Sequence, residues 1–191
     1  ALNHLYHNDL PSEKRKSPRL FVEDNVDPER MTALLDVIDT DRTVFNVITK
    51  SGSTSETMAQ LLIITRMLID RYGEEGLRDH LIATTDKQKG NLIGIAKKYS
   101  LRTFIISDGV GGRFSELCPV GLVAAAVGGA DVRALLAGAG YMDELCSNAD
   151  VKKNPGLMLA LLEIIAAEKH GANIGVLMPY ADSVSYTHLR A

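Results

Sequence analysis

Short apolar runs typical of strands alternate along the chain with longer stretches in which apolar residues recur at helical spacing. Strands are predicted over residues 20–24, 44–48, 80–84, 103–106 and 174–178. Helices are predicted over residues 28–38, 58–73, 91–99, 119–148 and 155–170. Strands joined by crossover helices indicate an α/β fold, with a mainly parallel sheet and helices on both faces in three αβα layers.

Capping residues indicate where several of these helices begin and end. Asp27 and Asn154 each precede a proline, which is typical of an N-cap followed by the first helical residue. Gly73 and Gly171 follow long helical stretches and predict helix ends. Because these signals agree with the hydrophobic periods, we expect the helix boundaries to lie near these four residues.

The segment over residues 49–57 carries the strongest chemical signal in the chain. It follows the apolar run 44–48 and leads into a helix, and six of its nine residues are hydroxylic. Ligands of parallel sheets bind at the carboxyl ends of strands. A helix N-terminus there exposes unpaired N–H groups and the positive end of the helix dipole, while Gly52 lets the backbone turn closely. This pattern predicts a phosphate-binding loop.

Helix capping is the alternative interpretation of the same hydroxyls. Ser51 or Ser53 together with Glu56 could form part of a capping box. A cap needs one or two hydroxyls, however, and this segment contains more than that. We therefore favour phosphate binding over capping alone.

A second glycine-rich segment, residues 108–115, follows the predicted strand 103–106. Glycines flank Arg113, so the backbone can bring its cation close to a ligand. A surface turn with a solvated arginine is the alternative. The segment begins like a dinucleotide-binding fingerprint, but Phe114 occupies the position of the last glycine, and the sequence contains no P-loop motif.

Composition narrows the class of protein without specifying a chemistry. Of the 191 residues, 46% are hydrophobic and 24% are charged, and the net charge of −3 lacks the basic excess of nucleic-acid-binding proteins. No apolar run is long enough to cross a membrane. Cys118, Cys146 and the five histidines lack metal-ligand spacing. We expect a cytoplasmic protein with no metal, no cofactor, no nucleic-acid partner and no membrane association.

Two signatures resemble the glucose-6-phosphate isomerase family of sugar-isomerase (SIS) domains. Residues 47–56 resemble the SIS loop of that family. Residues 111–115, followed by residues 119–122, resemble its Gly-Gly-Arg-Phe/Tyr-Ser segment. Asn154-Pro155 and residues 176–180 also look like bacterial members. The hydroxylic loop alone would fit many SIS proteins, whereas the pair of signatures in family order is specific.

The resemblance implies reversible interconversion of glucose 6-phosphate and fructose 6-phosphate without a cofactor. In the family, the sugar ring opens and a glutamate base moves a proton between C2 and C1 through a cis-enediolate. By position, Arg113 matches the arginine that stabilises the enediolate charge. The family's phosphate-binding run corresponds to Thr49, Lys50, Ser51, Gly52, Ser53 and Thr54. Thr49 and Ser53 stand where bacterial relatives often have Ser and Thr, and both retain the hydroxyl.

Several family segments have no counterpart in this sequence. They are an upstream Gly-Ile-Gly-Gly-Ser loop, the Glu-Ser-x-Gly-Lys segment with the base glutamate, a ring-opening histidine and a lysine near the C-terminus. We therefore expect an internal fragment of a bacterial isomerase that binds sugar phosphate weakly and does not turn it over. Residues 1–150 would form the first SIS domain, residues 151–184 the start of a second, and residues 185–191 a tail foreign to the family.

Two alternatives remain open within this resemblance. The parent could be another SIS sugar-phosphate isomerase, or a non-catalytic SIS regulator that senses a sugar phosphate. Arg113 favours an isomerase, because a sensor needs the phosphate loop but no group to stabilise an enediolate. The family also implies that the parent is a homodimer or a higher homo-oligomer.

Overall fold

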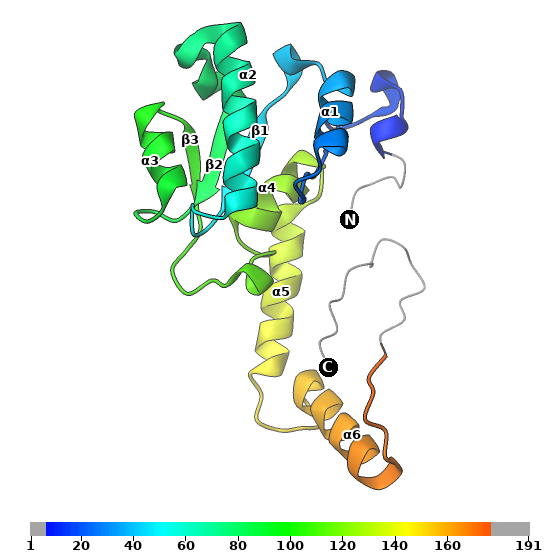
Figure 1. Ribbon diagram of the computed structural model, residues 1–191. Coiled ribbons are helices and arrows are strands. Elements are labelled where there is room, and N and C mark those ends of the chain that lie inside the picture. The colour runs from blue at the N-terminus through cyan, green and yellow to red at the C-terminus, as the bar shows by residue number, and fades with distance from the viewer. Residues whose placement is uncertain (1–6, 177–191) are drawn as a thin grey trace. The chain divides into compact units, whose positions relative to one another are not determined.

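The structure, a computed structural model, describes residues 7–176 (Figure 1). The chain divides into two compact units. One unit comprises residues 20–124 and contains the sheet. Residues 7–19 and 125–176 of the described chain belong to the other.

Within the described residues, the strands β1 (Phe45–Thr49), β2 (Leu81–Thr85) and β3 (Arg102–Ile105) form one parallel sheet in the order β1-β2-β3. The helices α2 (Ser55–His80) and α3 (Asn91–Lys98) connect consecutive strands. This arrangement confirms the expected α/β class with a parallel sheet and crossover helices. As a consequence, the loops that follow the three strands all emerge at the same edge of the sheet.

Two predicted strands are corrected by the structure. Residues 20–24 form no strand; Arg30 instead donates from Nη2 to the carbonyl oxygen of Val22 at 2.9 Å and from Nε to Glu23 at 2.8 Å. Residues 174–176 have no regular structure, and Ile174 is 79% exposed, while the rest of that predicted strand lies outside the described residues. An apolar run becomes a strand only where a neighbouring strand accepts its backbone hydrogen bonds.

Helix α1 (Pro28–Val37) begins as its capping signal predicts. The Asp27 carboxylate accepts hydrogen bonds from the backbone N–H groups of Glu29 and Arg30, and proline occupies the first helical position. A glycine breaks α2 where a helix end was expected: Gly73 has φ of 72° and ψ of 176°, and a second helical stretch continues to His80. Short 3₁₀ helices, η3 (Thr40–Arg42) and η4 (Gly112–Phe114), precede β1 and follow β3.

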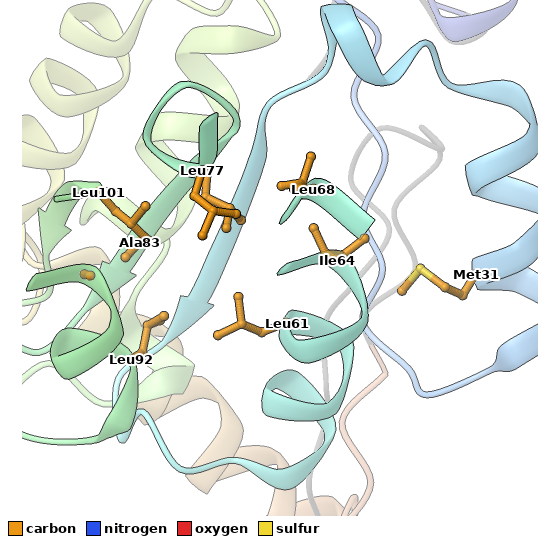
Figure 2. Close-up of a cluster of buried hydrophobic side chains, with 10 residues drawn as sticks. Met31, Leu61, Ile64, Leu68, Leu77, Ala83, Leu92 and Leu101 are labelled. Carbon is orange, nitrogen blue, oxygen red and sulfur yellow. The ribbon is translucent and has the colours of Figure 1, made fainter. Parts of the chain in front are cut away.

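The hydrophobic core of the sheet-containing unit lies between the strands and helices α1, α2 and α3 (Figure 2). Leucines of α2 and α3 pack against the central strand β2, and each fully buried leucine contributes about 1.5–3 kcal/mol. The buried cluster consists of Met31, Leu61, Ile64, Leu68, Leu77, Leu81, Ala83, Leu92, Ala96 and Leu101. This packing fixes the carboxyl ends of the strands and hence the origin of each loop.

The other unit contains a pair of contacting helices, α5 (Val132–Cys146) and α6 (Pro155–His170). Its remaining short 3₁₀ helices are η1 (His7–Asp9) and η2 (Ser12–Lys14). The predicted helical region 119–148 is two helices, α4 (Pro119–Val127) and α5, separated by residues 128–131. Helix α6 ends at Gly171, which has φ of 64°, as predicted.

Candidate functional site

A cavity of about 400 Å³ opens at the edge of the sheet where β1 and β3 end. Its walls come from the end of β1, the loop into α2, the loop after β3 and the first turn of α4. The lining residues are Ile48, Thr49, Lys50, Ser51, Thr54, Thr57, Ile106, Val110, Gly111, Gly112, Ser115 and Val120. The two segments singled out in the sequence, 49–57 and 108–115, therefore border the same space.

Three hydroxyl groups gather on one side of this cavity. The distance between Thr49 Oγ1 and Thr54 Oγ1 is 3.3 Å, that between Ser51 Oγ and Thr54 Oγ1 is 3.3 Å, and that between Thr49 Oγ1 and Ser51 Oγ is 3.5 Å. A hydroxyl can donate one hydrogen bond and accept others. This triangle can therefore present up to three donors to a single oxyanion.

Backbone groups of the loop hold two of these hydroxyls in place. Gly52 N–H donates to Thr49 Oγ1, and Ser53 N–H donates to Ser51 Oγ, both at 3.3 Å. Both oxygens act as acceptors toward the backbone, so neither hydroxyl proton is used by these backbone contacts. The hydroxyl protons lie within the triangle itself, where each can be turned from a neighbouring hydroxyl toward a ligand.

The first turn of α2 shows that the hydroxyls are not spent on capping. The N-cap residue is Thr54, and its side chain makes no capping hydrogen bond. Glu56 accepts a hydrogen bond from the Ser55 hydroxyl at 2.8 Å, and its own backbone N–H, followed by that hydroxyl, lowers the pKa of its carboxyl. The alternative capping box of Ser51 or Ser53 with Glu56 is therefore not formed, and the helix that begins at Ser55 presents its positive end beside the triangle.

The hydroxylic loop rests on a second loop that sequence reasoning missed. Gly52, with φ of 63°, accepts a hydrogen bond at its carbonyl from Asn91 N–H at 3.0 Å. A Cβ atom on Gly90 would lie 2.1 Å from the carbonyl oxygen of Ser51. The β2–α3 loop and the β1–α2 loop therefore touch through backbone atoms, with no room for a side chain between them.

Asp86, directly after β2, shapes this supporting loop. Its carboxylate accepts the N–H groups of Gln88 and Lys89 at 2.8 and 2.9 Å, and the side chain is nearly buried. These two bonds, and then the charges of Lys89 and Lys50, hold the pKa of the Asp86 carboxyl below its usual value. Asp86 was recognisable in principle, because ligand loops follow parallel strands and Asp86 directly follows β2. In the sequence, this rule is applied only to residues 49–57 and 108–115.

A lysine spans the cavity between its two principal loops. Lys50 Nζ donates to the carbonyl oxygen of Val110 at 2.6 Å, although the two residues are 60 positions apart. Lys50 is half-buried and, among the lining residues that the structure describes, it carries the one charged side chain. No lining residue in the described part of the chain carries a carboxylate or an imidazole.

The structure brings together only part of the predicted set of site residues. Thr49, Lys50, Ser51 and Thr54 line the cavity, whereas Gly52 supports the loop from below and Ser53 is exposed. Arg113 lies in η4, is exposed and does not line the cavity, although its neighbour Gly112 does.

Over residues 7–176, no group of three or more His, Cys, Asp or Glu side chains could hold a metal ion. Cys118 and Cys146 are free thiols. No helix in the same range is both long and apolar enough to cross a membrane.

Comparison with known proteins gives consistent matches in sequence. The family model described as phosphoglucose isomerase matches residues 4–188. The glucose-6-phosphate isomerase of Carboxydothermus hydrogenoformans is 50% identical over 186 residues, covering 97% of this chain and 40% of that protein. The Rubrobacter xylanophilus protein of the same name is 43% identical over 184 residues, covering 96% and 42%. The chain therefore spans about two fifths of the length of these curated relatives.

Solved structures give a similar result. A hypothetical protein from Thermus thermophilus has a TM-score of 0.70 and 42% identity, covering 74% of this chain and 34% of that one. A glucose-6-phosphate isomerase from Chlamydia trachomatis has a TM-score of 0.62 and 26% identity, covering 75% and 27%. Both matches cover about three quarters of this chain and about a third or less of the other.

Proposed function

Because the chain belongs to the phosphoglucose isomerase family, we propose that it supplies the phosphate-binding part of an isomerase acting on glucose 6-phosphate and fructose 6-phosphate. The family expected from the two sequence signatures is confirmed by the match over residues 4–188. Since the chain spans about two fifths of its curated relatives, the reaction is proposed for the family-length protein.

The observation that carries this proposal is the hydroxyl triangle beside the N-terminus of α2. The hydroxyl oxygens of Thr49, Ser51 and Thr54 lie within 3.5 Å of one another, and a bound oxyanion could accept the protons that these hydroxyls otherwise share. A hydrogen bond to a charged oxygen is worth about 1.5–3 kcal/mol, so three of them hold a phosphate group without a metal. The full proposed phosphate-binding set is Thr49, Lys50, Ser51, Gly52, Ser53 and Thr54.

Arg113 has a different proposed role, as the cation that stabilises the cis-enediolate. Negative charge develops on the sugar oxygens when a proton leaves C2 or C1, and a cation placed beforehand lowers that barrier. Gly112 lines the cavity next to Arg113, and the guanidinium side chain is long and exposed. This role supports an isomerase over a sugar-phosphate sensor, which needs no such cation.

The rest of the sequence-based description stays part of the proposal. The domains would be a first SIS domain over residues 1–150 and the start of a second over residues 151–184. The parent would be a homodimer or a higher homo-oligomer that needs no cofactor and binds no nucleic acid. A cytoplasmic location agrees with the free thiols of Cys118 and Cys146, because reducing compartments keep cysteines unpaired.

Titration of the chain with glucose 6-phosphate, inorganic phosphate and glucose, followed by NMR, tests the phosphate site. We expect both phosphate compounds to shift the amides of residues 49–57, and glucose to shift none of them. Thr54→Val should lower the affinity for glucose 6-phosphate and for inorganic phosphate about tenfold, since it removes one hydrogen bond to a charged oxygen. Ser55→Ala is the matched control, because the Ser55 hydroxyl donates to Glu56 and does not line the cavity.

Two results would contradict the proposal. One is that glucose binds as well as glucose 6-phosphate, which would remove the phosphate group as the recognised feature. The other is that Thr54→Val and Ser55→Ala have the same effect on affinity, which would mean that the hydroxyl triangle contributes no specific contact.

A further inference from the structure

At the start of the loop that follows β3, the Ile106 N–H donates to Thr85 O at 2.8 Å. Beyond that residue, the described segment 107–114 has one hydrogen bond to a distant part of its unit. Its other hydrogen bonds are local: Val110 N–H to Ser107 O, Phe114 N–H to Gly111 O, and the Ser115 hydroxyl to Gly112 O. Among the described residues, Lys50 Nζ to Val110 O is the bond that ties residues 107–114 to another loop.

Little else restricts this loop. Gly109 has φ of 84°, and a Cβ atom on Gly109 or Gly112 would meet no atom within 4 Å. Glycines without close neighbours leave a backbone with many accessible conformations. Between the nearly buried residues Ile106 and Ser115, the contact with Lys50 is therefore the hydrogen bond among the described residues that restrains where the loop lies above the cavity.

The tether acts on the segment that contains Arg113. Residues 111–115 form one internally bonded turn, because η4 is closed by the Phe114 N–H and the Ser115 hydroxyl. Val110 directly precedes this turn, so a bond that fixes the Val110 carbonyl also fixes where the turn begins. Arg113 lies three residues further along.

The chemistry of the ammonium group allows it to serve both loops. A lysine ammonium has three N–H donors, and the Val110 carbonyl accepts one of them at 2.6 Å. Two donors therefore remain for a ligand in the cavity that Lys50 lines. A single charged group can thus hold the second loop and still face a bound phosphate.

We propose that Lys50 is a positioning residue that ties the Val110 carbonyl to the phosphate loop and thereby places Arg113 over the bound sugar phosphate. The purpose of the tether rests on the proposed function, because Arg113 needs a fixed position only where a sugar phosphate reacts. The tether itself is a property of the ligand-free protein, so it can be tested separately.

Amide hydrogen exchange of the ligand-free chain tests the tether, with Lys50→Met and Lys50→Arg as variants. Lys50→Met should speed exchange of the hydrogen-bonded amides in residues 110–115, those of Val110 and Phe114, about tenfold, the population change that corresponds to losing one hydrogen bond of a charged group. Lys50→Arg should restore slow exchange, since a guanidinium can donate to the same carbonyl. Lys87→Met is the matched control, because it removes an exposed positive charge from the β2–α3 loop.

A second readout concerns Arg113 itself. Addition of glucose 6-phosphate should shift the NMR signal of the Arg113 Nε–H group in the original chain and in Lys50→Arg, and not in Lys50→Met. A change in stability alone would not be reversed by the arginine variant in this way.

Each outcome shows whether the Lys50–Val110 tether exists, independently of whether the loop binds phosphate. Unchanged exchange at residues 110–115 in Lys50→Met would overturn it, whatever happens to phosphate affinity. Faster exchange at these residues on adding glucose 6-phosphate to the original chain would also overturn it, because the ammonium would then have left Val110. Faster exchange in Lys50→Met without any phosphate binding would uphold the tether and remove the proposed function.

Discussion

Two glycines from different loops pack against each other beneath the hydroxyl triangle. Gly90 has φ of 93° and ψ of 167°, a conformation that residues with a side chain rarely adopt. Its Cα faces the backbone of Ser51 and Gly52, and the Asn91 N–H bonds to Gly52 O. The position of the Ser51 hydroxyl therefore depends on the absence of a side chain at position 90.

Replacing Gly90 by alanine should disturb both stability and phosphate binding. The new Cβ would lie 2.1 Å from Ser51 O, and the strained backbone alone costs about 1–3 kcal/mol. We expect a lower free energy of unfolding in urea, and a loss of affinity for inorganic phosphate because Ser51 must move.

Gly94→Ala is the control for this change. Gly94 lies inside α3, and a Cβ there would meet nothing within 4 Å. Removing a helix glycine should stabilise the protein by about 0.5–1 kcal/mol and leave phosphate affinity unchanged. Equal effects of the two substitutions on phosphate affinity would show that the contact between the loops does not support the site.

At the residue scale, the sequence predicts which side chains line the site better than it predicts which residues hold the site's loops in place. Thr49, Ser51 and Thr54 are recognisable because they crowd between a strand and a helix. Gly90 and Asn91 act through contacts with a loop almost 40 residues earlier, and no local pattern contains such a contact. The exposed orientation of Arg113 likewise depends on packing rather than on spacing.

At the scale of elements, a strand or helix is predicted correctly where its apolar pattern is accompanied by a packing partner or a capping residue. The three strands of the sheet, α1 and α6 combine an apolar pattern with a partner or a cap. Residues 20–24 have an apolar pattern but form no strand, and the Arg30 side chain of α1 bonds to the Val22 carbonyl oxygen and the Glu23 carboxylate. The break of α2 at Gly73 was recognisable as a stop, but not the helical turns that follow it.

The connection between α5 and α6 depends on a single nearly buried side chain. Asn154 Oδ1 accepts the Leu157 N–H at 2.9 Å and so caps α6. Its Nδ2 donates to the carbonyl oxygens of Cys146 and Asn148 at 2.7 and 2.8 Å. The side chain is 4% exposed, so water cannot easily replace these bonds.

Asn154→Ala should loosen α6 selectively. Loss of an N-cap costs about 0.5–2 kcal/mol, and the two carbonyls lose a donor as well. Hydrogen exchange should accelerate along the first turns of α6 and remain unchanged in the core strand β2. Asn154→Asp should give an intermediate effect, since the carboxylate keeps the cap but donates to neither carbonyl. Exchange in Asn154→Asp that equals that of the original chain would mean that the Nδ2 bonds contribute nothing, and equal effects of the two variants would mean that the cap contributes nothing.

At the scale of the whole molecule, the described residues that line the cavity supply hydrogen-bond donors and one cation, but no general base. The cavity is lined by hydroxyls, glycine backbone and one ammonium group, with no carboxylate or imidazole among the described lining residues. Asp86 and Glu56 lie nearby, but their pKa values are lowered and they are engaged with N–H groups or the Ser55 hydroxyl. If the proposed function holds, a base for C1 and C2 has to come from outside this set of residues.

We accordingly expect the purified chain to bind sugar phosphate weakly and to leave fructose 6-phosphate unconverted. General acid–base catalysis requires a group with a suitable pKa within hydrogen-bond reach of the transferred proton, and this cavity offers none. The measurement is exchange of the C1 and C2 protons of fructose 6-phosphate into D₂O, which detects single proton transfers even when the product does not accumulate. The full-length Carboxydothermus hydrogenoformans relative serves as the positive control. Exchange by the 191-residue chain that is lost in Arg113→Ala would overturn the expectation, because it would show that these residues already contain a working base.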